Sequence, residues 1–251
     1  MSIPIKTEEQ LKLMEEGGKK LALVKKMLLD SVNIGENAHE LDKKAEEMIR
    51  KQGGEPSFKM VRDYKWSTCV NVGAGVVHGI PKKEIIFKNG DVVSIDVGMY
   101  YKGFHTDTSF SVGLGVNEDI SYFLRAGKET LNLAIKKAKP GRRIYDISRA
   151  IEENLTMYKY SPIRALVGHG VGRDLHEEPQ IPCFAIGKYE DSPEIKEGMT
   201  LAIEVMYSMG SPDVKLDSDG WTISTRDGKI SALFEETIIV TKNRQKVLTA
   251  S

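Results

Sequence analysis

Long hydrophobic runs, paired cysteines and an excess of charge of either sign are all missing from this sequence. No stretch reaches the ~18 consecutive apolar residues of a membrane-spanning helix, and residues 1–10 lack the apolar core of a secretion signal. Cys69 and Cys183 have no metal-finger spacing, so we expect reduced thiols. Lys plus Arg and Asp plus Glu both number 36, which gives no electrostatic reason to expect nucleic acid or a membrane as partner. We therefore expect a cytoplasmic protein.

Length and composition are those of an ordinary globular protein. The 251 residues are 40% hydrophobic and 29% charged, so the chain can form one large domain or two small ones with a substantial core. The informative feature lies elsewhere, in a weak similarity between the first and second halves of the chain.

Each half begins with two stretches that predict helices. Residues 18–26 and 127–137 place apolar side chains three and four positions apart, which is the spacing of an amphipathic helix. Gly35 and Gly141 then each introduce a second helical stretch, and a glycine at such a position can end the preceding helix.

A histidine motif and two acidic strands follow each helix pair. The motif is His-x-x-Pro, at residues 78–81 and again at residues 176–179. A β-rich stretch then leads to Asp96 in one half and Glu204 in the other, each six residues after a glycine (96 − 90 and 204 − 198). Last, Asp107 and Glu235 precede short β-rich stretches, which places them at predicted strand starts.

The same elements in the same order predict a duplicated unit. The distances between elements differ in the two halves, so the chain is not a solenoid of fixed period. We expect an α+β fold in which two helix-helix-strand halves enclose one shared cleft, with residues 1–251 forming a single domain.

The acidic residues within the strands require an explanation. An unpaired carboxylate is costly to bury, and buried charges are paired or bind metals. Taken alone, Asp96 is explained equally well by a salt bridge, by a bulge or by a metal ion. Glu204 repeats the anomaly at the equivalent position, which favours a shared purpose. Asp107 and Glu235 taken alone say little, because acids at strand starts are usually solvated.

Three histidines stand beside glycines in predicted turns. They are His78, His169 and His176. A single histidine in such a turn is more often a capping residue than a catalytic one, but three in one chain change that balance. His105 has two open interpretations, a metal ligand or a structural residue.

Together these side chains make an oxygen-rich ligand set. Four carboxylates and one imidazole suit Mn, Fe, Co or Mg better than a tetrahedral zinc site with thiolates. Four negative charges exceed what one divalent ion balances, so the set favours two ions bridged by carboxylates. A pair of such ions is typical of a hydrolase.

Several segments resemble a known family. They are VVHGIP at 76–81, IDVGMYYKGFHTDT at 95–108, GHGVGRDLHEEP at 168–179, IE at 203–204 and FEET at 234–237. In combination they resemble the type I methionine aminopeptidases, from about residue 7 to about residue 241. The resemblance implies the pita-bread fold, an α+β fold with pseudo-twofold symmetry.

The resemblance implies a dinuclear metal site. Asp96 and Asp107 would bind one divalent ion, and the second ion would be bound by Asp107 together with three residues of the second half. These three are His169, Glu204 and Glu235. Asp107 and Glu235 would bridge the two ions.

It also implies the catalytic residues. Glu204 would act as general base as well as ligand, His176 would hydrogen-bond the scissile carbonyl, and His78 would contact the scissile amide. The free α-amine of the substrate would bind near the metals, so that only N-terminal residues are removed.

The implied methionine pocket departs from the family pattern. By the resemblance it is lined by Phe58, Tyr64, Cys69, Leu175 and Trp221. Val61 stands where the family has Tyr, and Leu175 stands where an aromatic residue is common. We expect a roomier pocket that still prefers Met, with a narrower margin over Leu. A monovalent cation site would use backbone oxygens around Gly73, Gly75 and Ser231.

The function implied is removal of the N-terminal methionine from nascent proteins, with preference for a small second residue. The enzyme would be a monomer that works close to the ribosome. Two alternatives remain at this point: an Xaa-Pro-type aminopeptidase on the same fold, and a pita-bread protein that binds peptides without catalysis. The second alternative requires lost ligands, whereas this chain retains all five.

Overall fold

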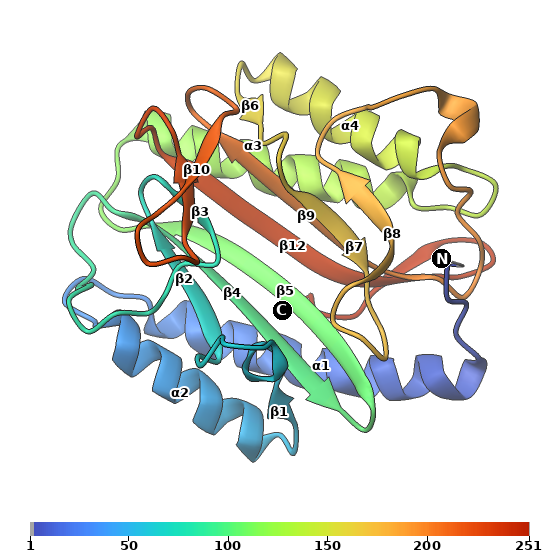
Figure 1. Cartoon of the computed structure of the whole chain (residues 1–251), viewed down its shortest axis with the longest axis horizontal. Helices are drawn as coiled ribbons and strands as arrows, with labels where there is room; N and C mark the ends of the chain where they lie inside the picture. The colour runs from blue at the N-terminus through green and yellow to red at the C-terminus, as the bar shows by residue number, and fades with distance from the viewer. Residues whose placement is uncertain (1–2, 251) are drawn as a thin grey trace.

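The computed structural model describes residues 3–250 and shows one large curved sheet with helices on its convex side (Figure 1). Across these residues the sheet has ten strands, in the order β1-β4-β5-β12-β9-β7-β8, with β2 beside β4, β6 beside β9 and β13 beside β12. Every pairing in it is antiparallel. No helix among the described residues has the length and hydrophobicity needed to cross a bilayer.

The strands divide between the two halves of the chain. The first half contributes β1 (Glu55–Pro56), β2 (Thr68–Val72), β3 (Gly75–Val77), β4 (Val92–Tyr101) and β5 (Phe104–Gly113). The second half contributes β6 (Ser161–Pro162), β7 (Val167–Gly170), β8 (Glu177–Pro182), β9 (Thr200–Ser208), β10 (Val214–Leu216), β11 (Ile223–Thr225), β12 (Ser231–Val240) and β13 (Gln245–Val247).

Two helix pairs cover the sheet, one pair for each half. They are α1 (Glu8–Ser31) with α2 (Ala38–Lys51), and α3 (Glu118–Lys137) with α4 (Ile144–Met157). Figure 1 shows α1 behind β4 and β5, and α3 behind β9 and β12. Gly35 and Gly141 precede the second helix of each pair, as the sequence predicted, and both adopt positive φ. They do not end the preceding helices, because α1 ends at Ser31 with Val32 as its C-cap and α3 ends at Lys137 with Ala138 as its C-cap.

Each half has its own hydrophobic core between helices and sheet. Leu21, Leu41 and Ile95 lie in the first core, and Phe123 and Ile151 lie in the second. The halves meet where β5 pairs with β12, so β4-β5 and β12-β9 are related by a pseudo-twofold axis at this seam. The predicted duplicated α+β architecture is confirmed.

Two local predictions were wrong. Asp107 and Glu235 lie in the middle of β5 and β12, not at strand starts. The reason is that β5 pairs with β4 from Phe104 onward, and β12 pairs with β9 from Ser231 onward, so both ladders begin well before the acids. His169 lies within β7, not in a turn, because it pairs with Ala202 of β9.

A small second sheet covers part of the open face. It has the order β10-β11-β3 and joins one strand of the first half to a hairpin of the second. Figure 1 shows it in front of the large sheet, beside β2. The loop between β10 and β11 carries Trp221 toward the concave side. Two short 3-10 helices, at Phe58–Met60 and Tyr189–Asp191, complete the structure.

Candidate metal centre and active site

Three of the acidic side chains share one row across the sheet. Asp96 on β4 stands opposite Ser109 on β5, Ser109 stands opposite Glu235 on β12, and Glu235 stands opposite Glu204 on β9. Asp107 precedes Ser109 by two residues. Because side chains alternate between the faces of a strand, it points to the same side as the row. Strand register therefore brings four carboxylates from four neighbouring strands to one place.

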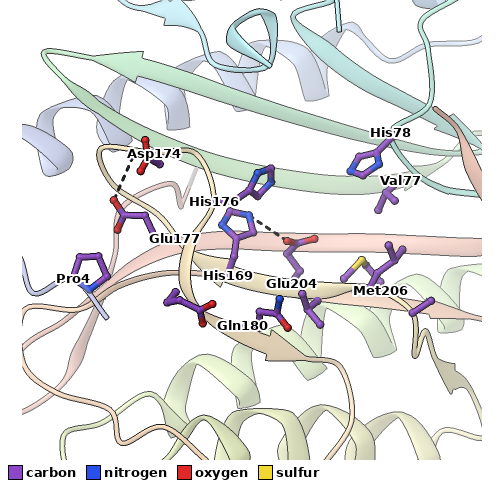
Figure 2. A pocket seen from close by; sticks show the side chains of 14 residues that line it. Pro4, Val77, His78, His169, Asp174, His176, Glu177, Gln180, Glu204 and Met206 are labelled. Atoms are coloured by element: carbon purple, nitrogen blue, oxygen red, sulfur yellow. Dashed lines mark hydrogen bonds and ion pairs between the residues drawn. The ribbon is translucent and has the colours of Figure 1, made fainter. Parts of the chain in front are cut away.

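His169 completes the cluster from the next strand. It pairs with Ala202, two residues before Glu204, and so lies on the same face. One ligand atom each from Asp107, His169 and Glu235 lie within 4.8 Å of one another. The His169 Nε2 is 3.5 Å from a Glu204 oxygen (Figure 2). All five side chains predicted as metal ligands are thus brought together.

The tautomer of His169 suits a ligand. Its Nδ1 lies 2.8 Å from the Gly170 carbonyl oxygen, which can only accept a hydrogen bond, so Nδ1 carries the proton. Nε2 is left with its lone pair toward the carboxylates. Burial lowers the pKa of His169 to about 3, so the imidazole is neutral near pH 7.

The carboxylates repel one another in the absence of a cation. Burial, with the nearby charges of Asp107 and Glu204, raises the pKa of Asp96 well above its usual range. Burial also raises the pKa of Asp107 to about 7, and that of Glu204 and of Glu235 well above the ordinary value. Four buried acids in one cluster are stable as anions only if positive charge compensates them.

Unsatisfied oxygens indicate where that charge belongs. Asp96 Oδ1 and Glu235 Oε1 are buried and have no hydrogen-bond partner among the residues that the structure describes. Most buried polar atoms in proteins are paired, and an orphaned carboxylate oxygen marks the place of a missing ion or water. The donor set, with hard oxygen ligands and one imidazole, fits divalent cations such as Mn, Fe or Co.

Two further histidines lie above this cluster. His78 follows β3 and adopts a left-handed φ of 58°, which turns its ring into the cleft. His176 precedes β8, and its ring centre is 4.5 Å from that of His169. Figure 2 shows the three imidazoles together with Glu204 around one space. Burial lowers the pKa of both His78 and His176, and the nearby charge of His176 lowers the pKa of His78 further. Both rings are therefore neutral N–H donors near pH 7.

An apolar cavity of about 200 Å³ opens directly from the carboxylates. Its walls include the five predicted pocket residues, Phe58, Tyr64, Cys69, Leu175 and Trp221. The Tyr64 ring packs edge-on against Trp221, with centroids 5.0 Å apart. The Tyr64 hydroxyl donates a 2.9 Å hydrogen bond to the Thr68 carbonyl, which fixes the ring. Both cysteines are free thiols, and Cys69 lies at the cavity wall.

A glycine on β4 allows the pocket to sit this close to the acids. A Cβ on Gly98 would come within 2.8 Å of the Ser57 Cβ and 2.9 Å of the Phe58 ring. The Ser57 N–H also donates to the Gly98 carbonyl. Only a residue without a side chain lets Phe58 approach β4 two residues from Asp96.

A second, wider cavity of about 530 Å³ continues on the other side of His78 and His176. His78, His169, His176 and Glu204 line both cavities, so these residues stand at the junction. Pro4 and Gln180 line the outer part of the wide cavity (Figure 2). The two cavities are therefore joined at His78, His169, His176 and Glu204.

The proposed backbone oxygens for a monovalent cation also lie together. The Ser231 N–H donates to the Gly73 carbonyl at 2.9 Å, and its hydroxyl donates to the Gly75 carbonyl at 2.8 Å. The three residues thus meet at the turn between β2 and β3.

Sequence reasoning missed several residues of the site. Val77 lines both cavities, and its place next to His78 was the available signal. Pro4 and Met206 line the wide cavity and carried no signal of their own. His105, for which two interpretations were open, is buried, and its Nδ1 lies 2.9 Å from the Ser57 hydroxyl. It does not belong to the group of ligand atoms around Asp107.

Comparison with known proteins gives a consistent result. Residues 12–242 match the model of metallopeptidase family M24. The chain is 41% identical to methionine aminopeptidase 1 of Bacillus subtilis over 245 residues, which cover 97% of this chain and 98% of that protein. It is 40% identical to a methionine aminopeptidase of Clostridium perfringens, with 98% of each chain covered.

Solved structures agree with the sequence comparison. The crystal structure of a methionine aminopeptidase from Thermotoga maritima superposes with a TM-score of 0.96 at 40% identity, with both chains covered completely. A prolidase from Pyrococcus furiosus shares the fold at a TM-score of 0.78 and 24% identity, but this chain covers only 65% of it.

Proposed function

Because the chain belongs to metallopeptidase family M24, among its methionine aminopeptidases, we propose that it removes the N-terminal methionine from nascent polypeptides using two divalent metal ions. One observation carries the proposal. Five ligand side chains from five strands line one cavity together with three aromatic rings. The volume of this cavity, about 200 Å³, suits a single side chain. A metal centre beside a small apolar pocket is the arrangement expected of an enzyme that binds one terminal side chain.

Four carboxylates support two ions rather than one. Asp96 and Asp107 would hold one ion, and Asp107, His169, Glu204 and Glu235 would hold the other. Asp107 and Glu235 lie on the two strands that meet at the seam, and they would be the ligands shared by the two ions. When bound, such ions lower the pKa of a water molecule and polarise the substrate carbonyl.

The chain's own side chains would carry out the remaining steps. Glu204 lines both cavities and would accept the proton of the attacking water. His176 and His78 face the same junction as neutral N–H donors, which suits His176 to stabilise the developing negative charge on the carbonyl oxygen. His78 would bind the scissile amide from the opposite side of the junction (Figure 2).

The pocket would select the methionine side chain. Phe58, Tyr64 and Trp221 offer ring faces and edges to a thioether, and each such contact contributes about 0.3–1.5 kcal/mol. The second substrate residue would then lie beside His78, Val77 and Met206. The rest of the polypeptide would leave through the wide cavity.

Peptide hydrolysis tests the proposal. The purified protein loaded with Mn(II) or Co(II) should release Met from Met-Ala-Ser, and only slowly from Met-Leu-Ser. Metal analysis should find close to two ions per chain. An Asp107→Asn variant should fold but bind fewer ions and lose turnover. Release of Xaa from Xaa-Pro peptides in place of Met would favour the prolidase-like alternative, and binding of peptides without release would favour a non-catalytic protein.

A further inference from the structure

The seam between the two halves of the sheet holds two of the proposed bridging ligands. β5 and β12 pair at only two positions, Glu235 with Ser109 and Glu236 with Thr108. The neighbouring β12-β9 ladder, in contrast, runs without interruption from Ser231 to Ile239. The relative position of Asp107 and Glu235 is therefore fixed by few main-chain hydrogen bonds.

Two threonine side chains add hydrogen bonds across the seam, one within this pairing and one beside it. The Thr237 hydroxyl donates to the Asp107 carbonyl at 2.7 Å and accepts from the Asp107 N–H at 2.9 Å. The Thr108 hydroxyl donates to the Glu235 carbonyl at 2.9 Å. Both ligand residues are thus held by a hydroxyl that comes from the opposite strand.

A buried ion pair stands directly behind these hydroxyls. Lys25 of α1 donates from Nζ to Glu236 Oε1 at 2.6 Å and to the Thr108 hydroxyl at 2.9 Å. The Lys25 side chain is only 8% exposed and that of Glu236 only 15%. Thr108 follows Asp107 in the chain, and Glu236 follows Glu235. The other Glu236 oxygen accepts from the Thr249 hydroxyl.

A pair of this kind is weak evidence for stability, because removing two charges from water costs about as much as their attraction returns. What the pair does achieve is geometric. One ammonium group contacts both strands, at the residues next to Asp107 and Glu235. It comes from α1, which lies behind β4 and β5 (Figure 1).

We propose that Lys25 and Glu236 are positioning residues, which hold β5 and β12 in the register that lets Asp107 and Glu235 bind the same two metal ions. The proposal rests on the function proposed above. Lys25 touches neither substrate nor ligand atoms in this role. It acts through Thr108 and Glu236 alone.

A double variant tests it without leaving an unpaired buried charge. In Lys25→Met/Glu236→Gln both charges are lost, while the amide can still accept from Thr249. Calorimetric titration of Mn(II) into the metal-free protein should show affinity for the ions reduced about 10- to 100-fold, as is usual when outer partners of ligands are removed. The kcat for Met-Ala-Ser should fall, with KM changed less than kcat. The single variant Lys25→Arg, which keeps a positive charge beside Glu236, should retain much of the wild-type affinity for Mn(II).

The chain offers a matched control. Lys6 and Glu177 form another buried ion pair, with side chains 5% and 7% exposed, and Glu177 follows His176 rather than a metal ligand. Lys6→Met/Glu177→Gln should therefore leave the affinity for Mn(II) unchanged. If both double variants lose metal affinity equally, the effect is a general loss of packing and the proposal is overturned.

Two further outcomes are decisive. Should Lys25→Met/Glu236→Gln fail to fold, Thr108→Val removes the hydroxyl that joins Lys25 to Glu235, and its metal affinity should fall in the same way. Wild-type affinity in the folded double variant, or in Thr108→Val, overturns the proposal. A wild-type protein that binds no divalent ion or releases no Met would instead overturn the proposed function.

Discussion

Removing the divalent ions should make the stability of this protein fall as pH rises from 7 to 8.5. In the metal-free fold, burial and mutual repulsion raise the pKa of Asp96, Glu204 and Glu235 well above the ordinary value. In the unfolded chain the same groups are ionised throughout this range. The folded state therefore binds more protons than the unfolded state, and stability is lost as pH rises toward the folded pKa values.

The window is chosen so that other groups do not oppose this trend. Burial depresses the folded pKa values of His78, His105, His169 and His176, so these groups destabilise the fold only below their unfolded value of 6.5 and are largely neutral in both states above pH 7. Asp107, with a pKa of about 7, gives up its remaining proton in the lower part of this window, which changes stability in the same direction as the other three acids. The buried thiols of Cys69 and Cys183 begin to matter only near their unfolded value of 9.0.

Linkage gives the magnitude. Each carboxyl group that keeps its proton in the fold costs about 1.4 kcal/mol per pH unit. Over 1.5 units, one such group would reduce the free energy of unfolding by about 2 kcal/mol and three by about 6 kcal/mol. For a chain of this size about 2 kcal/mol corresponds to a shift of the melting temperature by roughly 4–8 °C.

Thermal unfolding at constant ionic strength measures the effect. The chelated protein should lose melting temperature steadily from pH 7 to 8.5, whereas the Mn(II)-loaded protein should not, because metal ligands are already deprotonated in its folded state. Glu235→Gln has one acid fewer and should show a shallower slope when chelated. A chelated protein whose melting temperature stays level or rises across the window would refute the reasoning.

Three further predictions concern single side chains. Glu204→Gln should reduce kcat by at least about 10²–10⁴-fold with the fold intact, and activity within a few-fold of wild type would contradict its role as general base. Leu175→Phe adds a ring to the pocket and should raise the Met-over-Leu ratio of kcat/KM, by up to about tenfold if the thioether gains about 1.4 kcal/mol; an unchanged ratio for Met-Ala-Ser and Leu-Ala-Ser excludes Leu175 as a determinant. Lys6→Met leaves Glu177 buried without its partner and should cost about 3–5 kcal/mol in urea unfolding, most of it recovered in Lys6→Met/Glu177→Gln. Equal stabilities for Lys6→Met and wild type would show that the pair carries no such penalty.

Much of the fold could be predicted because both halves repeat the same pattern. The acids in apolar strands, Asp96 and Glu204, gave the row of ligands, since a charge within a buried strand needs a partner. Strand limits were predicted less well. Phe104-His-Thr and Ser231-Ala-Leu do not stand out as strands by composition, yet each pairs with a partner strand, the first with β4 and the second with β9.

What could not be predicted depends on contacts between distant segments. Lys25 is one of several lysines on an amphipathic helix, and nothing in the local sequence distinguishes it from those that are solvated. Its partner Glu236 is 211 residues away. The same holds for Lys6 with Glu177, 171 residues apart. The small sheet that carries Trp221 to the pocket likewise joins β3 to a hairpin from the other half.

The position of the ligands at the seam has a consequence for the ancestry of the site. Each half supplies two carboxylates at equivalent positions, Asp96 and Asp107 from one and Glu204 and Glu235 from the other. A single ancestral half, paired with an identical copy through the strand that became β5 and β12, would already have gathered four acids around one twofold axis. His169 has no counterpart on the other side of that axis among the clustered ligand atoms. Gene duplication would have freed one copy to acquire it, and with it an asymmetric centre able to hold a substrate in a single direction.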